Sequence, residues 1–177
     1  MLDSLAETVR AVFGARAVSI MVRAGDQLVF AAVAGQGADT MPGRRIPAGT
    51  GMAGWVLAAG QPLVVEDVTQ DPRFAADYAR TTGYLPRGIM TAPLLGDDGP
   101  VGVISVLDRP RRTEFSLVEV ELLERFCHLA VLALQHGDGA PEDAPISDLA
   151  AAVASLPPRR RAAAERLLDA LTAVLEA

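Results

Sequence analysis

Residues 46–74 read IPAGTGMAGWVLAAGQPLVVEDVTQDPRF, and this stretch decides the fold. Its glycine-rich start predicts a turn into a short helix over residues 51–59, which the next glycine ends. The apolar residues 62–65 then predict a short strand. An acidic loop follows, and Pro72 stands at the first position of a helical turn expected over residues 71–80, where proline is tolerated. The stretch therefore predicts a helix, a strand and a helical turn in close succession.

Hairpins flank this stretch on both sides. Apolar and polar residues alternate over residues 18–22, a Gly-Asp turn follows, and residues 27–33 have the pattern of an antiparallel partner. Residues 34–45 contain four Gly or Pro residues without periodicity, which predicts a loop. Further along, residues 89–95 and 101–107 predict two strands joined by a Gly-Asp-Asp-Gly turn. Two hairpins with few long helices between strands favour an antiparallel or mixed sheet.

Amphipathic helices are expected at the two ends of this sheet-forming region. Residues 2–13 carry apolar side chains at helical spacing, and residues 116–136 form the longest predicted helix. Ser116 and Glu119 fit a capping box at its start. Residues 126–134 are apolar nearly all round, so this part of the helix has to bury two faces. One face can cover the sheet, and the other requires the N-terminal helix, a second subunit or both, which is the sequence argument for a homodimer.

These elements together predict an α/β (α+β) fold with a central, mainly antiparallel sheet of five or six strands and helices on both faces. The helices over residues 2–13 and 116–136 are expected on one face, and residues 51–88 on the other.

The chain divides into three expected parts. Residues 1–136 form the domain, and residues 137–146 form a polar linker rich in Gly, Pro and acidic residues. Residues 147–177 form a helical tail that is too short to hold a core of its own. We therefore expect the tail to dock on the domain or on a partner.

The composition excludes several classes of protein. Half of the 177 residues are hydrophobic and 21% are charged, as in soluble globular domains, and no apolar run reaches membrane-spanning length. The N-terminus lacks the pattern of a signal peptide, so we expect a cytoplasmic protein without membrane association. A net charge of −6 argues against a nucleic-acid partner. The single cysteine, Cys127, excludes an internal disulfide and a multi-cysteine metal site.

An ordered series of short motifs resembles the GAF domain family over about two thirds of the chain. The series starts with the stretch at 46–74 and continues through Thr82-Gly83-Tyr84, residues 86–90, residues 92–94, residues 102–106, Asp108-Arg109 and Phe115-Ser116. GAF domains usually bind a small molecule and report its presence, and they rarely catalyse. The resemblance implies a ligand pocket between the sheet and the segment corresponding to residues 51–88.

Aromatic and polar residues of that segment are the candidate ligand-binding residues, because a concave site combines apolar contact with a few orienting polar groups. The aromatic candidates are Trp55, Phe74, Tyr78 and Tyr84, and the polar candidates are Asp67, Asp71 and Arg87. Core packing is the favoured alternative for Trp55 and Phe74. A charge at a strand edge is the alternative for Arg87.

Two motifs point to nucleotides, and the sequence disfavours both readings. Residues 49–54 match G-x-G-x-x-G, but the surrounding hairpins do not supply the parallel unit that a dinucleotide site needs. Close backbone packing explains the glycines better. The cyclic-nucleotide-binding members of the family carry Asn-Lys, then Phe, then an acidic pair, where this chain has Asp108-Arg109, Phe115 and Glu119. These departures lower the case for cyclic GMP, and Arg109 and Glu119 are expected to survive as a structural ion pair.

The chain lacks the residue patterns of a catalytic cysteine site and of a two-histidine metal site. Some stand-alone GAF proteins reduce free methionine sulfoxide with several cysteines, whereas Cys127 lies alone on an apolar helix. His128 and His136 are eight residues apart, which does not fit two ligands of one metal on a helix. The sequence therefore predicts no enzyme and no metal site, and it leaves any cofactor unknown.

The sequence thus predicts a non-catalytic, homodimeric regulatory module that binds an unidentified small molecule and signals through the helix over residues 116–136 and the tail. Its output would act through contacts with a separate signalling protein. The alternative is a ligand-free structural module for dimerisation or protein interaction, with the pocket filled by side chains. An open pocket with Tyr78 and Tyr84 facing inward would favour sensing.

Overall fold

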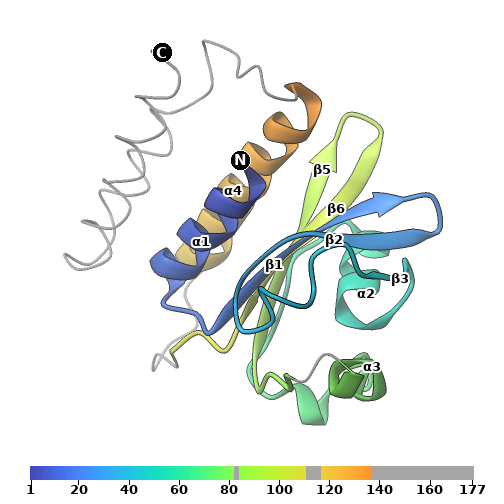
Figure 1. The fold of residues 1–177 in the computed structure, drawn as a ribbon, viewed down its shortest axis with the longest axis vertical. Coiled ribbons are helices and arrows are strands. Elements are labelled where there is room, and N and C mark those ends of the chain that lie inside the picture. Colours follow the sequence, from blue (N-terminus) through green and yellow to red (C-terminus); the bar gives the residue numbers. More distant parts are fainter. Residues whose placement is uncertain (82–83, 111–116, 137–177) are drawn as a thin grey trace.

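A six-stranded antiparallel sheet, in the order β3-β2-β1-β6-β5-β4, forms the middle layer of the computed structural model (Figure 1). The structure describes residues 1–81, 84–110 and 117–136. The strands are β1 (Ala17–Ala24), β2 (Gln27–Gly35), β3 (Arg45–Pro47), β4 (Leu63–Val65), β5 (Ile89–Gly96) and β6 (Gly99–Leu107). Every neighbouring pair is antiparallel, which confirms the predicted fold class.

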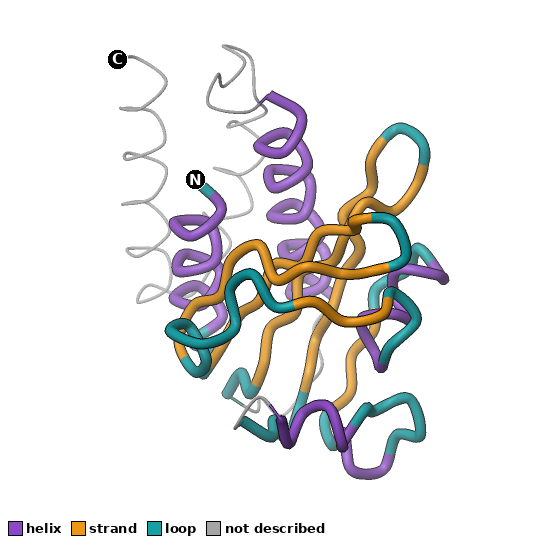
Figure 2. Tube along the Cα trace, turned by 45° about the vertical axis from the view of Figure 1, so that its right-hand side comes forward, coloured by secondary structure: helices purple, strands orange, loops and turns teal. Residues whose placement is uncertain are grey.

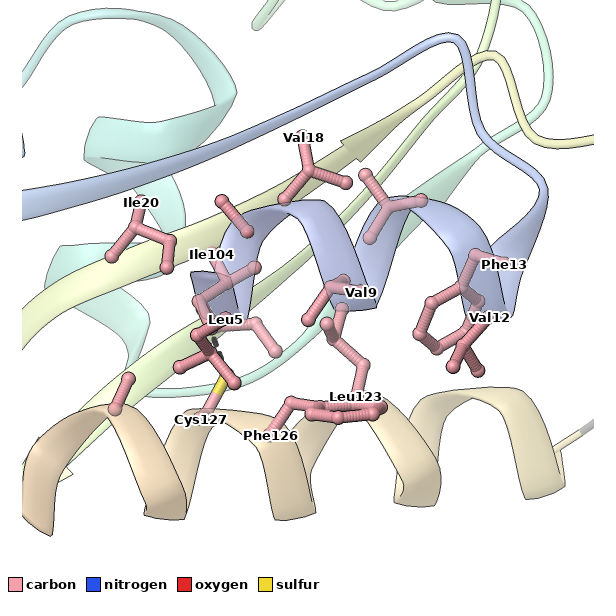
Figure 3. Packing of buried hydrophobic residues seen from close by; sticks show 14 of the residues in the cluster. Leu5, Val9, Val12, Phe13, Val18, Ile20, Ile104, Leu123, Phe126 and Cys127 are labelled. Carbon is pink, nitrogen blue, oxygen red and sulfur yellow. Dashed lines mark hydrogen bonds between the residues drawn. The ribbon is translucent and has the colours of Figure 1, made fainter. Parts of the chain in front are cut away.

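Two helices lie side by side on one face of the sheet, α1 (Leu2–Phe13) and α4 (Leu117–His136) (Figures 1 and 2). The apolar residues of the two helices pack against the strand residues that point to this face. Together they form the larger hydrophobic core, which we call the helix-face core. Phe13 of α1 and Phe126 of α4 meet edge to face with ring centroids 6.4 Å apart (Figure 3). Ile20 and Ile104 of the sheet belong to the same core. This arrangement matches the expectation that both helices share one face.

Shorter elements cover the opposite face, namely α2 (Gly51–Ala59), the 3-10 turn η1 (Val68–Gln70) and α3 (Ala76–Thr81). Their smaller core includes Met21, Val56 and Val103. A Cβ atom on Gly54 would lie 2.3 Å from the carbonyl carbon of Gly49, so only glycine permits this approach of the turn to the helix. The G-x-G-x-x-G motif therefore serves backbone packing, as the sequence indicates.

The structure corrects three boundaries. The segment 34–45, expected to be a loop, contributes its ends to β2 and to β3, a three-residue edge strand that pairs with the hairpin. The helical turn expected from Pro72 begins only at Ala76, because the Asp71 carboxylate accepts the backbone N–H of Arg73 at 2.9 Å and forms a turn there. The strand expected from residue 101 begins at Gly99.

Several expectations fall outside the described residues. They concern the capping role of Ser116, the linker over residues 137–146 and the helical tail over residues 147–177. Within the described part of the chain, no helix is long and apolar enough to cross a membrane.

Candidate ligand-binding site

A cavity of about 140 Å³ lies between the sheet and the elements that cover its α2 side. We call it the main cavity. The strands β1, β2 and β6 form its floor, and α2, α3 and the loops at 36–41 and 84–86 form its walls. Its larger lining side chains are Met21, Phe30, Val33, Gln36, Met41, Ile46, Met52, Phe74, Tyr78, Tyr84, Ile89 and Leu107. No described residue in the lining is charged.

Three hydroxyl side chains form a row across the sheet, and two of them belong to the floor of the main cavity. Ser19 of β1 stands opposite Ser105 of β6, which stands opposite Thr91 of β5. All three are buried, and Thr91 Oγ1 donates a hydrogen bond of 3.0 Å to Ser105 Oγ. Ser19 and Ser105 line the cavity, whereas Thr91 supports Ser105 from behind. The floor therefore offers a polar strip within an otherwise apolar site.

Three of the predicted site residues line the main cavity: Phe74, Tyr78 and Tyr84. Burial raises the pKa of the Tyr78 hydroxyl above its ordinary value, against the opposing effect of Arg44. Tyr78 is therefore a neutral phenol near pH 7.

Three other predicted residues lie outside this lining. Trp55 sits on the outer side of α2 with 38% of its surface exposed, and the Arg73 guanidinium lies 4.7 Å from its ring centroid. Asp71 holds that guanidinium through hydrogen bonds of 2.9 and 2.6 Å, which lower the pKa of Asp71 to about 2. Asp67 caps η1 by accepting the backbone N–H of Thr69. These residues shape the covering segment from its solvent side.

A second, more polar cavity of about 360 Å³ lies beyond Tyr84, and Arg87, the remaining predicted residue, lines it. Arg16, Glu66, Asp108 and Arg109 supply its other charged groups. Tyr84 and Ile89 line both cavities, so they form part of the partition between them.

Asp108 fastens this partition to the end of β6. Its carboxylate accepts hydrogen bonds from the Tyr84 hydroxyl and from the backbone N–H groups of Arg87 and Gly88, the latter two at 2.7 and 3.0 Å. Asp108 adopts a left-handed backbone conformation with φ of 51°, which aspartate tolerates better than most residues. Burial and the contact with Asp108 raise the pKa of Tyr84, so Tyr84 stays a hydrogen-bond donor.

The neighbouring residue, Arg109, joins the sheet to α4. Its guanidinium lies 2.6 Å from Glu66 Oε1 and 3.2 Å from Glu119 Oε2, and the side chains of Arg109 and Glu119 are only 9% and 10% exposed. The predicted pair of Arg109 and Glu119 is confirmed. Two adjacent residues at the end of β6 thus make different contacts: Asp108 with the cavity wall and Arg109 with the first turn of α4.

Cys127 lies in the helix-face core and belongs to the described lining of neither cavity (Figure 3). Its thiol contacts the carbonyl oxygen of Ala92 at 3.7 Å, and burial raises its pKa well above the ordinary range. Reactive cysteines have the opposite properties, exposure and a lowered pKa. No cluster of three potential metal ligands occurs among the residues that the structure describes.

The sequence missed the methionines, Ser19 and Ser105 as lining residues. Alternation along β6 was the available signal, because Val103 and Ser105 point to the α2 side while Ile104 points to the helix-face core. The partnership of Tyr84 with Asp108 spans 24 residues and has no local signal.

Comparison with curated proteins finds relatives among cyclic-nucleotide phosphodiesterases. The dual 3′,5′-cyclic-AMP and -GMP phosphodiesterase 11 of Drosophila melanogaster is 28% identical over 93 residues, which cover 52% of this chain and 6% of that protein. The probable 3′,5′-cyclic phosphodiesterase pde-5 of Caenorhabditis elegans is 31% identical over 86 residues, 49% of this chain and 12% of that protein. The chain thus corresponds to a small part of these proteins.

Solved structures of similar fold come from other settings. The GAF domain of an Acinetobacter phosphoenolpyruvate-protein phosphotransferase has a TM-score of 0.65 at 16% identity and covers 76% of this chain and 80% of that chain. A free methionine-R-sulfoxide reductase from Neisseria meningitidis, in complex with its substrate, has a TM-score of 0.59 at 25% identity and covers 76% and 77%. The GAF domain family model matches residues 1–134, and this chain therefore belongs to the GAF domain family.

Proposed function

We propose that this chain is a small-molecule-responsive regulatory domain whose ligand occupies the main cavity. The observation that carries the proposal is an open cavity between sheet and covering segment, with Tyr78 and Tyr84 in its lining. GAF domains serve as small-molecule-binding sensory or regulatory modules, which supports the same function here. The cavity favours sensing over the alternative, a ligand-free interaction module, since that module would have its pocket filled by side chains.

Binding in the main cavity affects α4 through the contacts at the end of β6. A ligand against Tyr84 changes the position of its hydroxyl and thus its contact with Asp108. Asp108 is followed by Arg109, whose guanidinium holds Glu119 in the first turn of α4. A ligand with different affinities for two arrangements of this chain of contacts shifts their populations.

The output side of the proposal is α4, with a second copy of the chain or a separate signalling protein as the partner. Leu117 and Val118, beside the ion-paired Glu119, are 74% and 52% exposed in this chain. A partner that covers them would sense any movement of the first turn. Neighbouring exposed apolar side chains are a feature of surfaces that bind other proteins.

The proposed role is regulatory rather than catalytic. The buried thiol of Cys127 supports this choice, because reduction of methionine sulfoxide by cysteine chemistry needs an accessible thiolate. Asp108 stands where the cyclic-nucleotide-binding members carry Asn, and its carboxylate is hydrogen-bonded to residues of the partition. This difference supports a ligand other than a cyclic nucleotide.

Native mass spectrometry of the purified protein, before and after gentle denaturation, tests binding and assembly together. We expect a dimer with a reproducible extra mass that is released on denaturation. A dimer without extra mass in any preparation, and without binding in a ligand screen, would favour the interaction module.

Hydrogen exchange tests the coupling. With ligand bound, we expect slower exchange in residues 84–88 and 117–136. In Asp108→Asn, binding should persist while exchange in α4 no longer responds. Asp98→Asn, an exposed carboxylate in the β5–β6 turn, is the matched control. Unchanged α4 exchange in the wild-type protein on saturation would refute the coupling.

A further inference from the structure

We propose that the main cavity takes a small, uncharged ring compound that seats one hydrogen-bonding edge on the hydroxyls of Ser19 and Ser105. The inference rests on the proposed function, in which this cavity is the ligand site. It adds the chemical class of the ligand, which differs from the cyclic AMP and cyclic GMP named for the phosphodiesterase of Drosophila melanogaster.

The size of the cavity sets the first limit. Its volume is about 140 Å³. An engineered apolar cavity of roughly 150 Å³ in another protein holds benzene. The main cavity therefore encloses one substituted ring, whereas a nucleotide with base, sugar and phosphate would extend beyond it.

The chemistry of the lining sets the second limit. The described lining holds aliphatic, aromatic, thioether, amide and hydroxyl groups but no ionised side chain. Moving an ionised group from water into such surroundings without a partner is strongly unfavourable. Arg109, in the second cavity, already contacts Glu66 and Glu119, and the Tyr84 hydroxyl is directed to Asp108. An uncharged ligand avoids this penalty.

The hydroxyl row sets the orientation. Ser105 Oγ forms one hydrogen bond, with Thr91 Oγ1, so its hydroxyl has capacity for another, and Ser105 lines the cavity. Ser19, directly across the β1–β6 ladder, brings a second hydroxyl to the same floor. A ligand with a hydroxyl, ring N–H or carbonyl on one edge can pair with both, since each hydroxyl donates and accepts.

Three methionines favour a flat ring above this strip. Met21 lies on the floor, Met52 on α2 and Met41 on the loop, so thioethers surround the site from three elements. Methionine adapts its shape to the guest and makes favourable sulfur contacts with aromatic ring edges.

Methyl NMR of the full chain with ¹³C-labelled methionine offers the direct test, with phenol as the polar probe and toluene as its matched apolar counterpart. The chain has five methionines. We expect saturable shifts at Met21, Met41 and Met52 with phenol, and none at Met90, which lies in the helix-face core. Ala53→Phe, which fills the cavity from α2, should abolish the shifts, whereas Ala58→Phe on the exposed side of the same helix should keep them.

The double variant Ser19→Ala with Ser105→Ala tests the polar strip. We expect the ratio of phenol affinity to toluene affinity to fall about tenfold, the scale of one net hydrogen bond or slightly more. An unchanged ratio would overturn the role of the hydroxyls. An unshifted Met90 methyl resonance in this double variant and in Ala53→Phe will show that the fold is intact.

Cyclic GMP, added as a charged probe, separates the two levels of the proposal. Binding of cyclic GMP that Ala53→Phe abolishes, with no binding of phenol, would overturn the ligand class but preserve the cavity as the site. Binding of any probe that ignores Ala53→Phe, or no shift at the three cavity methionines with any probe, would overturn the proposed function as well.

Discussion

The two faces of the sheet differ in both construction and content. On one face, the long helices α1 and α4 bury a continuous apolar core around Phe13 and Phe126. On the other, short elements and turns enclose a cavity, a row of buried hydroxyls and a partition held by hydrogen bonds. Binding sites and mobile elements of proteins commonly lie in loops and short elements of low local stability, which a rigid core supports. We infer that stability resides mainly on the helix face and responsiveness on the cavity face.

The largest expected effect breaks the helix face. Phe126→Ala should lower the free energy of unfolding by ~3–5 kcal/mol, because it removes a fully buried ring and leaves a void. Phe74→Ala, the same change in the partly exposed cavity lining, should cost less than half as much. Urea unfolding measures both. Equal losses would mean that the two faces contribute alike.

The ion pair that joins the faces should have the next largest effect. Arg109→Gln removes the positive charge 3.2 Å from the buried carboxylate of Glu119 and should cost about 3 kcal/mol, the low end for breaking a buried pair. Adding Glu119→Gln should recover part of that loss, because both charges are then gone. Denaturant unfolding of the two single variants and the double variant measures the coupling. Additive losses would contradict a direct pair.

The partition itself should be less costly to weaken. Asp108→Asn keeps the shape of the side chain but removes the charge from three hydrogen bonds, with an expected loss of about 1–2 kcal/mol. Amide exchange at Arg87 and Gly88 should accelerate, while exchange in the β1–β2 hairpin stays unchanged. Uniform acceleration throughout the sheet would assign Asp108 to global stability instead of the partition.

The smallest effect concerns the outer surface of the cavity face and its dependence on pH. The folded-state pKa of Asp71 is about 2, below the ordinary value of 3.8, so the Asp71–Arg73 contact is complete above pH 4 and is lost as the pH falls through about 2. Trp55, the single tryptophan, lies under Arg73 and should report this step by fluorescence. Asp71→Asn should lack the step, with far-UV circular dichroism to show that both proteins remain folded. A step of equal size in Asp71→Asn would exclude Asp71 as its source.

The same comparison shows what could be predicted from sequence. Helical spacing over residues 2–13 and the glycines that bracket residues 51–59 predicted two helices with the observed bounds. The edge strand β3 was missed because its three residues form a strand only by pairing with β2.

For the site, the sequence suggested Phe74, Tyr78 and Tyr84 through their type and position, and the structure places them in the lining. Ser19 and Ser105 were missed because a small polar residue in a strand gives no sign of what covers it. Asp108 was judged only against a nucleotide signature, whereas its observed partners come from a loop 20 or more residues earlier in the chain.

The main cavity also has a mechanical consequence. Unfolding removes imperfectly packed volume, so hydrostatic pressure favours states in which a loosely packed region has rearranged. The cavity lies on one face only, and pressure should therefore loosen α2 and its neighbouring loops before it disturbs α1 and α4. A bound ligand would occupy the cavity and make the domain less compressible. The pressure midpoint of unfolding should therefore rise with occupancy of the main cavity.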